Sequence, residues 1–348
     1  MYTIREIGEN IKDSKHFNGN VLFNIPMSEK TTMHVGGEAS LIIEPFDETS
    51  LSFALKYLSS TEYAKDFHIL GGGSNIIASD TGIKIPIISL RKLKAKIEII
   101  DIKDKNENAE QTIKCSAGMS WAEIFKFCTE HSFTGLLEFT GLPGTVGGAC
   151  YMNASCFNSS IAKVLLSAEY MTEDGEKRVY EMNQDDWDYK KSPFQTSCEG
   201  KKNIVTSATF KVYTSNSNIH SQGLAFIEKR KEKGHYKKPC AGSVFKNPKG
   251  EIAGKLADFT IITSDNPRDE DPQAIIDDIK IGIGKTDGAY TEIIDRKEAI
   301  KYAIENGQPG DVVILAGKGH EDYQEIKGVK YPMDERVLIA EVLEELRG

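Results

Sequence analysis

The sequence lacks the long apolar runs that a membrane-spanning helix requires. No window reaches the roughly 18 consecutive apolar residues that cross a bilayer, and residues 1–16, MYTIREIGENIKDSKH, contain no apolar core of signal-peptide length. We therefore expect no membrane span and a cytoplasmic location.

Cysteine pairs and excess positive charge are also missing. The six cysteines show no CxxC spacing, the pattern used by zinc sites and redox motifs, so we expect reduced thiols and no metal ion. The 43 basic and 52 acidic residues give a net charge of −9, which argues against a general nucleic-acid binder. The densest basic stretch, residues 229–233, is typical of a solvated helix face; a local groove for an anionic ligand is the alternative.

What the sequence does contain is an alternation of short apolar segments, helical patterns and glycine-rich turns. Its 348 residues allow two or three domains. Apolar periodicity predicts the first set of strands at 41–45, 67–70, 85–90, within 94–118 around a charged turn at 101–110, and at 164–171, 177–181 and 204–213. The same reasoning predicts helices at 49–59 and 121–131 and at the end of 216–233.

After residue 258 strands and helices alternate, which suggests a parallel sheet covered by helices. The predicted strands are 259–263, 292–294 and 311–316, and the predicted helices are 273–282, 297–306 and 334–345.

Two glycine-rich loops are suited to an anion such as a pyrophosphate. Glycine permits positive φ and a close approach of backbone N–H groups to a ligand; a purely structural turn is the alternative for either loop. Neither loop matches the GxGxxG fingerprint, and Gly284-Lys285-Thr286 lacks the preceding glycine of an ATP loop because Ile279 occupies that position. The predicted cofactor-binding residues are Gly71, Gly72, Gly73, Ser74 and Asn75 in the first loop and Gly141, Pro143, Gly144, Thr145, Gly147 and Gly148 in the loop 141–148.

Five separated motifs together resemble one family, the FAD-dependent UDP-N-acetylenolpyruvoylglucosamine reductases, over about residues 18–256. The motifs are residues 31–39, 70–75, 141–149 with Met152-Asn153-Ala154, 189–194 and 241–248. The resemblance implies an α+β FAD-binding fold of the vanillyl-alcohol-oxidase type. It also implies NADPH as co-substrate, a UDP-sugar substrate and formation of UDP-N-acetylmuramate for peptidoglycan synthesis.

The same resemblance assigns roles to single residues. Ser243 matches the family's proton donor, and Tyr189, Lys246 and Asn247 match substrate contacts. Lys190 stands where the family usually has arginine, and it keeps the charge but loses the planar fork that grips a carboxylate at two points. The family's C-terminal segment with its catalytic glutamate has no match after Leu256, so we expect impaired turnover.

The remaining residues resemble the C-terminal α/β domain of UDP-N-acetylmuramoyl-tripeptide synthetases, which are Mur ligases. The matching motifs are residues 263–268, Asp295-Arg296, 316–321 and Tyr323-Gln324. By this resemblance Asn266, Arg268, Gly317 and Glu321 bind meso-diaminopimelate; an arginine fork suits that amino acid's extra carboxylate. The ligase's ATP-binding domain has no match, so we expect no ATP-dependent ligation.

These resemblances predict four domains: two FAD-binding subdomains at 1–92 and 93–213, a truncated substrate domain at 214–257 and a ligase-like domain at 258–348. Two other interpretations stay open at this stage. One is a diaminopimelate-binding fragment with an inert reductase part, and the other is a non-functional hybrid.

Overall fold

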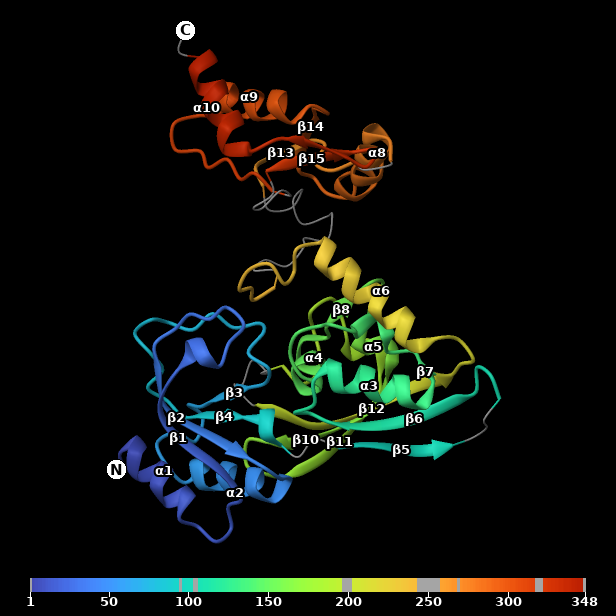
Figure 1. Cartoon of the computed structure of the whole chain (residues 1–348). Coiled ribbons are helices and arrows are strands. Elements are labelled where there is room, and N and C mark those ends of the chain that lie inside the picture. The colour runs from blue at the N-terminus through green and yellow to red at the C-terminus, as the bar shows by residue number, and fades with distance from the viewer. Residues whose placement is uncertain are drawn as a thin grey trace. The chain divides into compact units, whose positions relative to one another are not determined.

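The computed structural model describes residues 2–93, 96–102, 106–195, 202–242, 257–267, 270–316 and 322–346. The chain divides into two compact units, Met1–Val244 and Phe245–Gly348 (Figure 1). In the described part of the chain, no helix is both long and apolar enough to cross a membrane.

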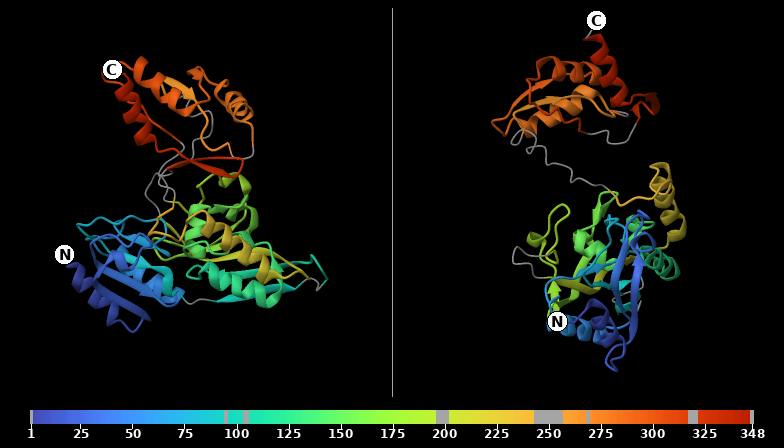
Figure 2. Two further views of the ribbon diagram at one scale, coloured as in Figure 1. Left: turned by 45° about the horizontal axis from the view of Figure 1, so that its top comes forward. Right: turned by 90° about the vertical axis from the view of Figure 1, so that its left-hand side faces the viewer.

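The first unit begins with a small α/β layer. Its four-stranded sheet has the order β1-β2-β4-β3, in which β1 runs antiparallel to β2 while β2, β4 and β3 are parallel. Helices α1 and α2 pack on one side of this sheet (Figures 1 and 2). The elements are α1 (Ile4–Lys12), β1 (Gly19–Pro26), β2 (Glu38–Pro45), α2 (Glu48–Ser59), β3 (His68–Leu70) and β4 (Ile87–Ser89).

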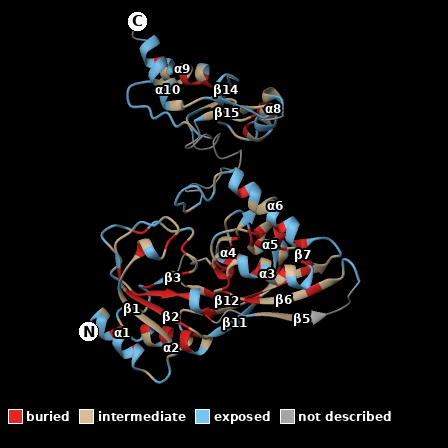
Figure 3. Ribbon diagram, in the orientation of Figure 1, coloured by how far each residue is buried: buried red, intermediate tan, exposed pale blue. Residues whose placement is uncertain are grey.

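Helix α2 shows why this layer forms. The Asp47 side chain accepts a hydrogen bond from the Ser50 N–H at 2.8 Å and so caps the first turn. Leu51, Ala54 and Leu58 recur at helical spacing and are fully buried, so the helix has one apolar face for the sheet. Figure 3 marks in red the buried residues on α2 and on β2.

A six-stranded antiparallel sheet follows, with the order β11-β10-β12-β6-β5 and with β7 paired to β12. Helices α3, α4 and α5 cover one face, where the Trp121 and Phe139 rings stack with centroids 4.7 Å apart. The strands are β5 (Ile97–Ile102), β6 (Glu110–Ser116), β7 (Phe133–Thr134), β10 (Leu165–Thr172), β11 (Lys177–Glu181) and β12 (Asn203–Thr214), with the short hairpin β8 (Ser155–Cys156) and β9 (Ser159–Ser160). The helices are α3 (Trp121–His131), α4 (Val146–Met152) and α5 (Ile161–Val164).

An ion-pair cluster on the opposite face joins this sheet to α2. Glu169 lies 2.7 Å from the Lys114 ammonium, and Lys177 contacts both Glu169 and Glu48, at 3.2 and 2.7 Å. Burial alone would raise the pKa of Glu169, but hydrogen bonds from Lys114, Ser207 and Lys177 outweigh it and lower the pKa from 4.5 to about 2.

Helix α6 (Ile219–Glu232) packs on α3 through a glycine. A Cβ added to Gly223 would lie 2.1 Å from the Phe125 ring, so a larger residue there would displace that ring or the helix. The buried positions Ile219, Gly223 and Arg230 lie on one face of the helix.

The second unit is smaller, and its described residues form two separate strand pairs. Strands β13 (Phe259–Ile262) and β14 (Ala289–Glu292) are parallel and connected through α8 (Pro272–Ile283). A hairpin forms from β15 (Tyr323–Ile326) and β16 (Val329–Pro332), and α9 (Arg296–Asn306) packs against α10 (Glu335–Glu345). Buried Arg296 donates from Nε to Glu335 at 2.8 Å and from Nη2 to the Ala316 carbonyl at 2.8 Å.

Three predicted elements differ from the structure. Residues 311–316 form no strand, and Val312 and Ile314 are 84% and 81% exposed; an apolar run indicates a strand only where a neighbouring strand pairs with it. The short strand predicted at 292–294 lies at 289–292. The loop predicted at 141–148 ends at Thr145, whose side chain caps α4, so Gly147 and Gly148 lie in a helical turn.

Candidate functional site

The two glycine loops meet in the first unit. The Ser74 hydroxyl donates to the Pro143 carbonyl at 3.1 Å. A Cβ added to Gly72 would lie 2.4 Å from the Cα of Gly144, and one added to Gly144 would lie 2.6 Å from Ser74 Oγ. Glycine at 72 therefore lets the two backbones touch, glycine at 144 leaves room for the Ser74 hydroxyl, and the loops form one continuous cradle.

Backbone conformation fixes the shape of this cradle. Gly73, Gly141 and Gly144 have φ of 70°, 75° and 109°, a region that other L-residues rarely adopt. The Thr145 side chain accepts from the Gly148 N–H at 3.5 Å and starts α4 directly after the second loop. Asn75 Nδ2 lies 3.6 Å from the sulfur of Met152, at the end of that helix.

A third segment is tied to the first loop through Thr32. The Thr32 N–H donates to the Gly73 carbonyl at 3.1 Å, and the Cys240 N–H donates to the Thr32 carbonyl at 3.2 Å. The Thr32 hydroxyl also donates to the Cys240 carbonyl. Residues 240–242 therefore lie beside the first glycine loop. The predicted residues Ser243, Lys246 and Asn247 follow directly but lie outside the described residues.

The predicted substrate residues Tyr189 and Lys190 lie in a turn anchored to the end of α4. The Asn153 amide donates to the Asp188 carbonyl at 2.8 Å, and the Ser192 hydroxyl donates to the Tyr151 carbonyl at 2.7 Å. Lys190 has φ of 52°, and its ammonium lies 5.7 Å from the centroid of the Tyr189 ring. The structure thus brings the motif 189–194 to the same helix as the second glycine loop.

One buried residue of α6 escapes the sequence reasoning. Within the basic stretch 229–233, Lys229 and Lys231 are exposed as predicted for a solvated face, but Arg230 is only 3% exposed. Its Nε and Nη2 donate to the carbonyls of Thr140 and Glu138, both at 2.9 Å. Its spacing of seven from Gly223 is the signal that identifies the buried face, because residues seven apart share one side of a helix.

Two buried cysteines of this unit, Cys128 and Cys150, are not poised for chemistry. Burial raises the pKa of Cys128 and of Cys150 to about 12, so both stay protonated thiols at neutral pH. Cys240 is exposed and free.

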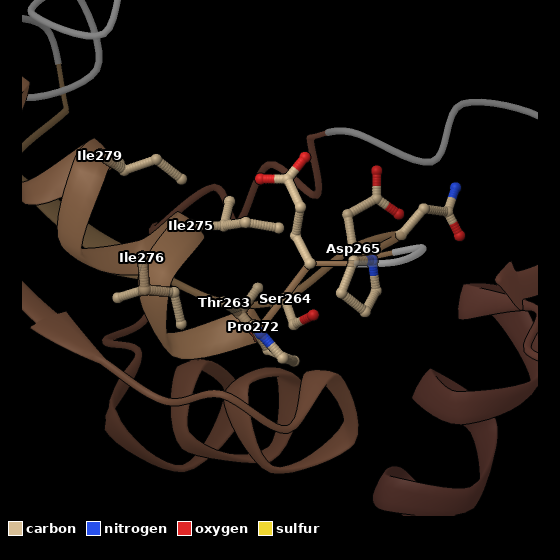
Figure 4. Close-up of a pocket in the computed structure, with 10 residues that line it drawn as sticks. Thr263, Ser264, Asp265, Pro272, Ile275, Ile276 and Ile279 are labelled. Atoms are coloured by element: carbon tan, nitrogen blue, oxygen red, sulfur yellow. The ribbon is translucent and has the colours of Figure 1, made fainter. Parts of the chain in front are cut away.

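The second unit has a cavity of about 430 Å³ at the start of α8 (Figure 4). Asp265 and Asn266 border it, and both contact β15: the Asp265 carbonyl accepts from Gln324 Nε2 at 2.7 Å and Asn266 Oδ1 accepts from the Glu325 N–H at 2.9 Å. The structure therefore unites the motifs 263–268 and 323–324. Arg268, Gly317 and Glu321 lie outside the described residues. The cavity is lined by Thr263, Ser264, Asp265, Asn266, Pro267, Glu270, Pro272, Ile275, Ile276 and Ile279.

Comparison with known proteins assigns the two parts of the chain to different families. An FAD binding domain model matches residues 39–179, and a model of the Mur ligase, glutamate ligase domain, matches residues 231–319. The chain is 40% identical over 249 residues to a UDP-N-acetylenolpyruvoylglucosamine reductase of Treponema denticola, a match that covers 68% of this chain and 75% of the relative. The reductase of Bacillus pumilus is 31% identical, with 69% and 75% covered.

Two further similarities concern a solved structure and the last part of the chain. The crystal structure of the Thermus caldophilus reductase superposes with a TM-score of 0.49 at 25% identity, covering 70% of this chain and 79% of that one. A UDP-N-acetylmuramoyl-L-alanyl-D-glutamate–2,6-diaminopimelate ligase of Caldanaerobacter subterraneus subsp. tengcongensis is 57% identical over 96 residues. Those residues make up 28% of this chain and only 20% of the ligase.

Proposed function

This chain belongs to the UDP-N-acetylenolpyruvoylglucosamine reductase family, and we propose that it reduces that UDP-sugar to UDP-N-acetylmuramate with NADPH as hydride source. Its fold is an FAD-binding fold of the vanillyl-alcohol-oxidase type followed by a Mur ligase C-terminal domain. The first unit is accordingly that of an FAD-dependent oxidoreductase. The division into four domains at 92, 213 and 257 remains our proposal for how these folds are subdivided.

The observation that carries the proposal is the contact between the two glycine loops. The cradle fits FAD because backbone N–H groups bind a pyrophosphate where no side chain intervenes, and a Cβ at Gly72 or Gly144 would fill the contact. The loop residues at 71–75 and 141–148 are those we propose to hold the cofactor.

The chemistry divides between cofactor and chain. FAD held by the loop residues 71–75 and 141–148 would supply hydride transfer from NADPH to the enolpyruvyl double bond. Tyr189 and Lys190, anchored at the end of α4, are proposed to hold the anionic substrate. Lys190 can neutralise a carboxylate at one point but not grip it at two. Ser243, with Lys246 and Asn247 nearby in sequence, is proposed to deliver the proton that completes the reduction.

The absorbance spectrum of the purified full-length chain tests the cofactor. We expect bound flavin, or a flavin spectrum gained on adding FAD. A colourless protein that never gains this spectrum contradicts the proposal, and it would favour the inert-reductase or hybrid interpretation.

We expect the second half-reaction, reduction of the substrate by the flavin, to be impaired. Reduction of the flavin by NADPH needs only the cofactor site, whereas reduction of the substrate also needs a placed proton donor and the family's glutamate. That glutamate has no counterpart after Leu256. A misplacement of about 1 Å costs roughly 100-fold in rate.

Stopped-flow measurement of both half-reactions checks this expectation. The comparison protein has the residues after Leu256 exchanged for an intact reductase ending. We expect similar flavin reduction in the two proteins and much faster substrate reduction in the exchanged one. Equal rates of substrate reduction would refute the argument from the missing ending.

A second candidate function belongs to the second unit. The cavity beside Asp265 and Asn266, together with the ligase similarity over 96 residues, supports binding of meso-diaminopimelate with Arg268, Gly317 and Glu321 as further contacts. We expect binding without ATP-dependent ligation. Calorimetry with millimolar diaminopimelate tests this, and an absence of heat at that concentration would remove the candidate.

A further inference from the structure

Arg230 and Tyr236 hold one side of the second glycine loop from outside. Arg230 donates to the carbonyls of Glu138 and Thr140, both at 2.9 Å, and the Tyr236 hydroxyl donates to the Gly141 carbonyl at 2.6 Å. Three carbonyls within four residues are therefore turned toward α6 and the segment that follows it. Neither Arg230 nor Tyr236 belongs to a glycine loop.

One of these bonds sets the direction of the Gly141 N–H group. In a trans peptide the C=O and the following N–H point in opposite directions. With the Thr140 carbonyl held by Arg230, the N–H of Gly141 points away from α6. Gly141 has φ of 75°, and an added Cβ would lie 2.4 Å from the Tyr236 oxygen, so the contact with Tyr236 requires glycine at this position.

The Arg230 guanidinium also places a positive charge beside the carbonyl groups that precede the second glycine loop. Arg230 is 3% exposed, and within the described residues it forms no ion pair with a carboxylate. The Phe157 ring lies 4.8 Å from its Cζ, and its other partners are the carbonyls of Glu138 and Thr140 and the Cys156 thiol. A buried charge that is balanced only by dipoles and a ring still attracts an anion bound nearby, because the surrounding dielectric is low.

We infer that Arg230 is a positioning residue for the diphosphate of the dinucleotide cofactor, acting through the loop 138–144 rather than by touching the ligand. The inference rests on the proposed FAD site and adds to it a residue of α6. It assigns α6 a part in cofactor binding as well as in packing on α3.

The test compares three variants of the full-length chain. Arg230→Met removes the charge and both hydrogen bonds. Arg230→Lys keeps the charge but cannot bridge two carbonyls in the same way. Lys229→Met is the matched control, because it removes one positive charge from an exposed position of the same helix. The dissociation constant of FAD is measured by quenching of flavin fluorescence, and the thermal unfolding of each apoprotein is recorded separately.

We expect Arg230→Met to raise the FAD dissociation constant by roughly 10- to 100-fold, the size associated with losing charged hydrogen bonds. Arg230→Lys should recover part of that affinity, and Lys229→Met should match the wild type. A residue with only a structural role would lower apoprotein stability and leave the FAD affinity of the folded fraction unchanged.

Unchanged affinity in Arg230→Met overturns the inference. Should that variant not fold, Arg230→Lys decides alone, and wild-type affinity there overturns the inference. A wild-type chain that binds no FAD is a different result, because it refutes the proposed function and not only this role of Arg230.

Discussion

Replacing Gly72 by alanine would push the two glycine loops apart. The new Cβ would lie 2.4 Å from the Cα of Gly144, 2.9 Å from its carbonyl carbon and 3.2 Å from the nitrogen of Thr145. All three are backbone atoms, so no side-chain rotation can relieve the clash. Carbon atoms in contact lie about 3.5 Å apart, and the loops must therefore separate by about 1 Å.

The expected cost has two parts. Overpacking of this kind destabilises a protein by about 1–3 kcal/mol, and a displacement of about 1 Å in a positioning element costs roughly 100-fold in rate. We expect Gly72→Ala to bind FAD much more weakly and to reduce its flavin about 100-fold more slowly at equal occupancy. Fluorescence titration and stopped-flow reduction measure the two effects.

Gly148→Ala adds the same methyl group without displacing the loops. Comparing it with Gly72→Ala therefore distinguishes the effect of loop displacement from the effect of a methyl group that occupies space needed by the ligand. A Cβ at Gly148 would meet only Thr145 Oγ1, at 3.6 Å, which is an ordinary contact. This variant should keep the stability of the wild type, and any loss of FAD affinity in it reports a cofactor contact at Gly148. If Gly72→Ala binds and reduces FAD like the wild type, the loops are not held together as described.

Three other predictions concern stability and reactivity. The pKa of Glu169 is lowered from 4.5 to about 2, so the stability that its ion pairs contribute is present above about pH 4.5 and is lost as the pH falls toward 2. This pKa difference corresponds to about 3 kcal/mol at most, which solvent screening reduces to about 1 kcal/mol. In urea unfolding, Glu169→Gln should be less stable than the wild type at pH 7 and equally stable near pH 2, whereas a difference that persists at pH 2 would show that the ion pairs are not its cause. Iodoacetamide at pH 8 should alkylate Cys240 in the native protein but Cys150 only after unfolding, since burial raises the Cys150 pKa to about 12; rapid native labelling of Cys150, read by peptide mass spectrometry, would contradict this. Arg296→Met leaves the mostly buried Glu335 without its partner and should destabilise the second unit by about 3 kcal/mol, whereas an unchanged urea transition for that unit would show that the pair contributes nothing.

Local patterns predicted some helices and some strands with their observed bounds, such as strand 177–181, and missed others. Helix 121–131 has the bounds expected from its apolar spacing, because a helix satisfies its hydrogen bonds within one segment. The capping box of Thr3 and Glu6 marks α1, which the sequence reasoning overlooked. The apolar run 311–316 carries every local sign of a strand, yet strand formation depends on a partner elsewhere in the chain, which composition cannot reveal.

The two glycine loops were recognisable from the sequence, because clustered glycines leave a clear signal. The structure brings the loops into contact at Gly72 and Gly144, and their binding of one cofactor stays a prediction. Arg230 was not predictable from charge, since an arginine among lysines on a helix is usually solvated. Only the neighbouring buried positions, which depend on how α6 packs on α3, identify it as an inward-facing residue.

The hydrogen bonds of Thr32 join segments that the ribosome synthesises at different times. Thr32 contacts Gly73 and also Cys240, which is 208 positions further along the chain. At a synthesis rate of about 5–20 residues per second, roughly 10–40 s separate the two ends of this contact on the ribosome. During that interval the first glycine loop exists without the segment around Cys240, so the nascent chain completes the proposed cofactor pocket only after nearly all of the first unit has been translated.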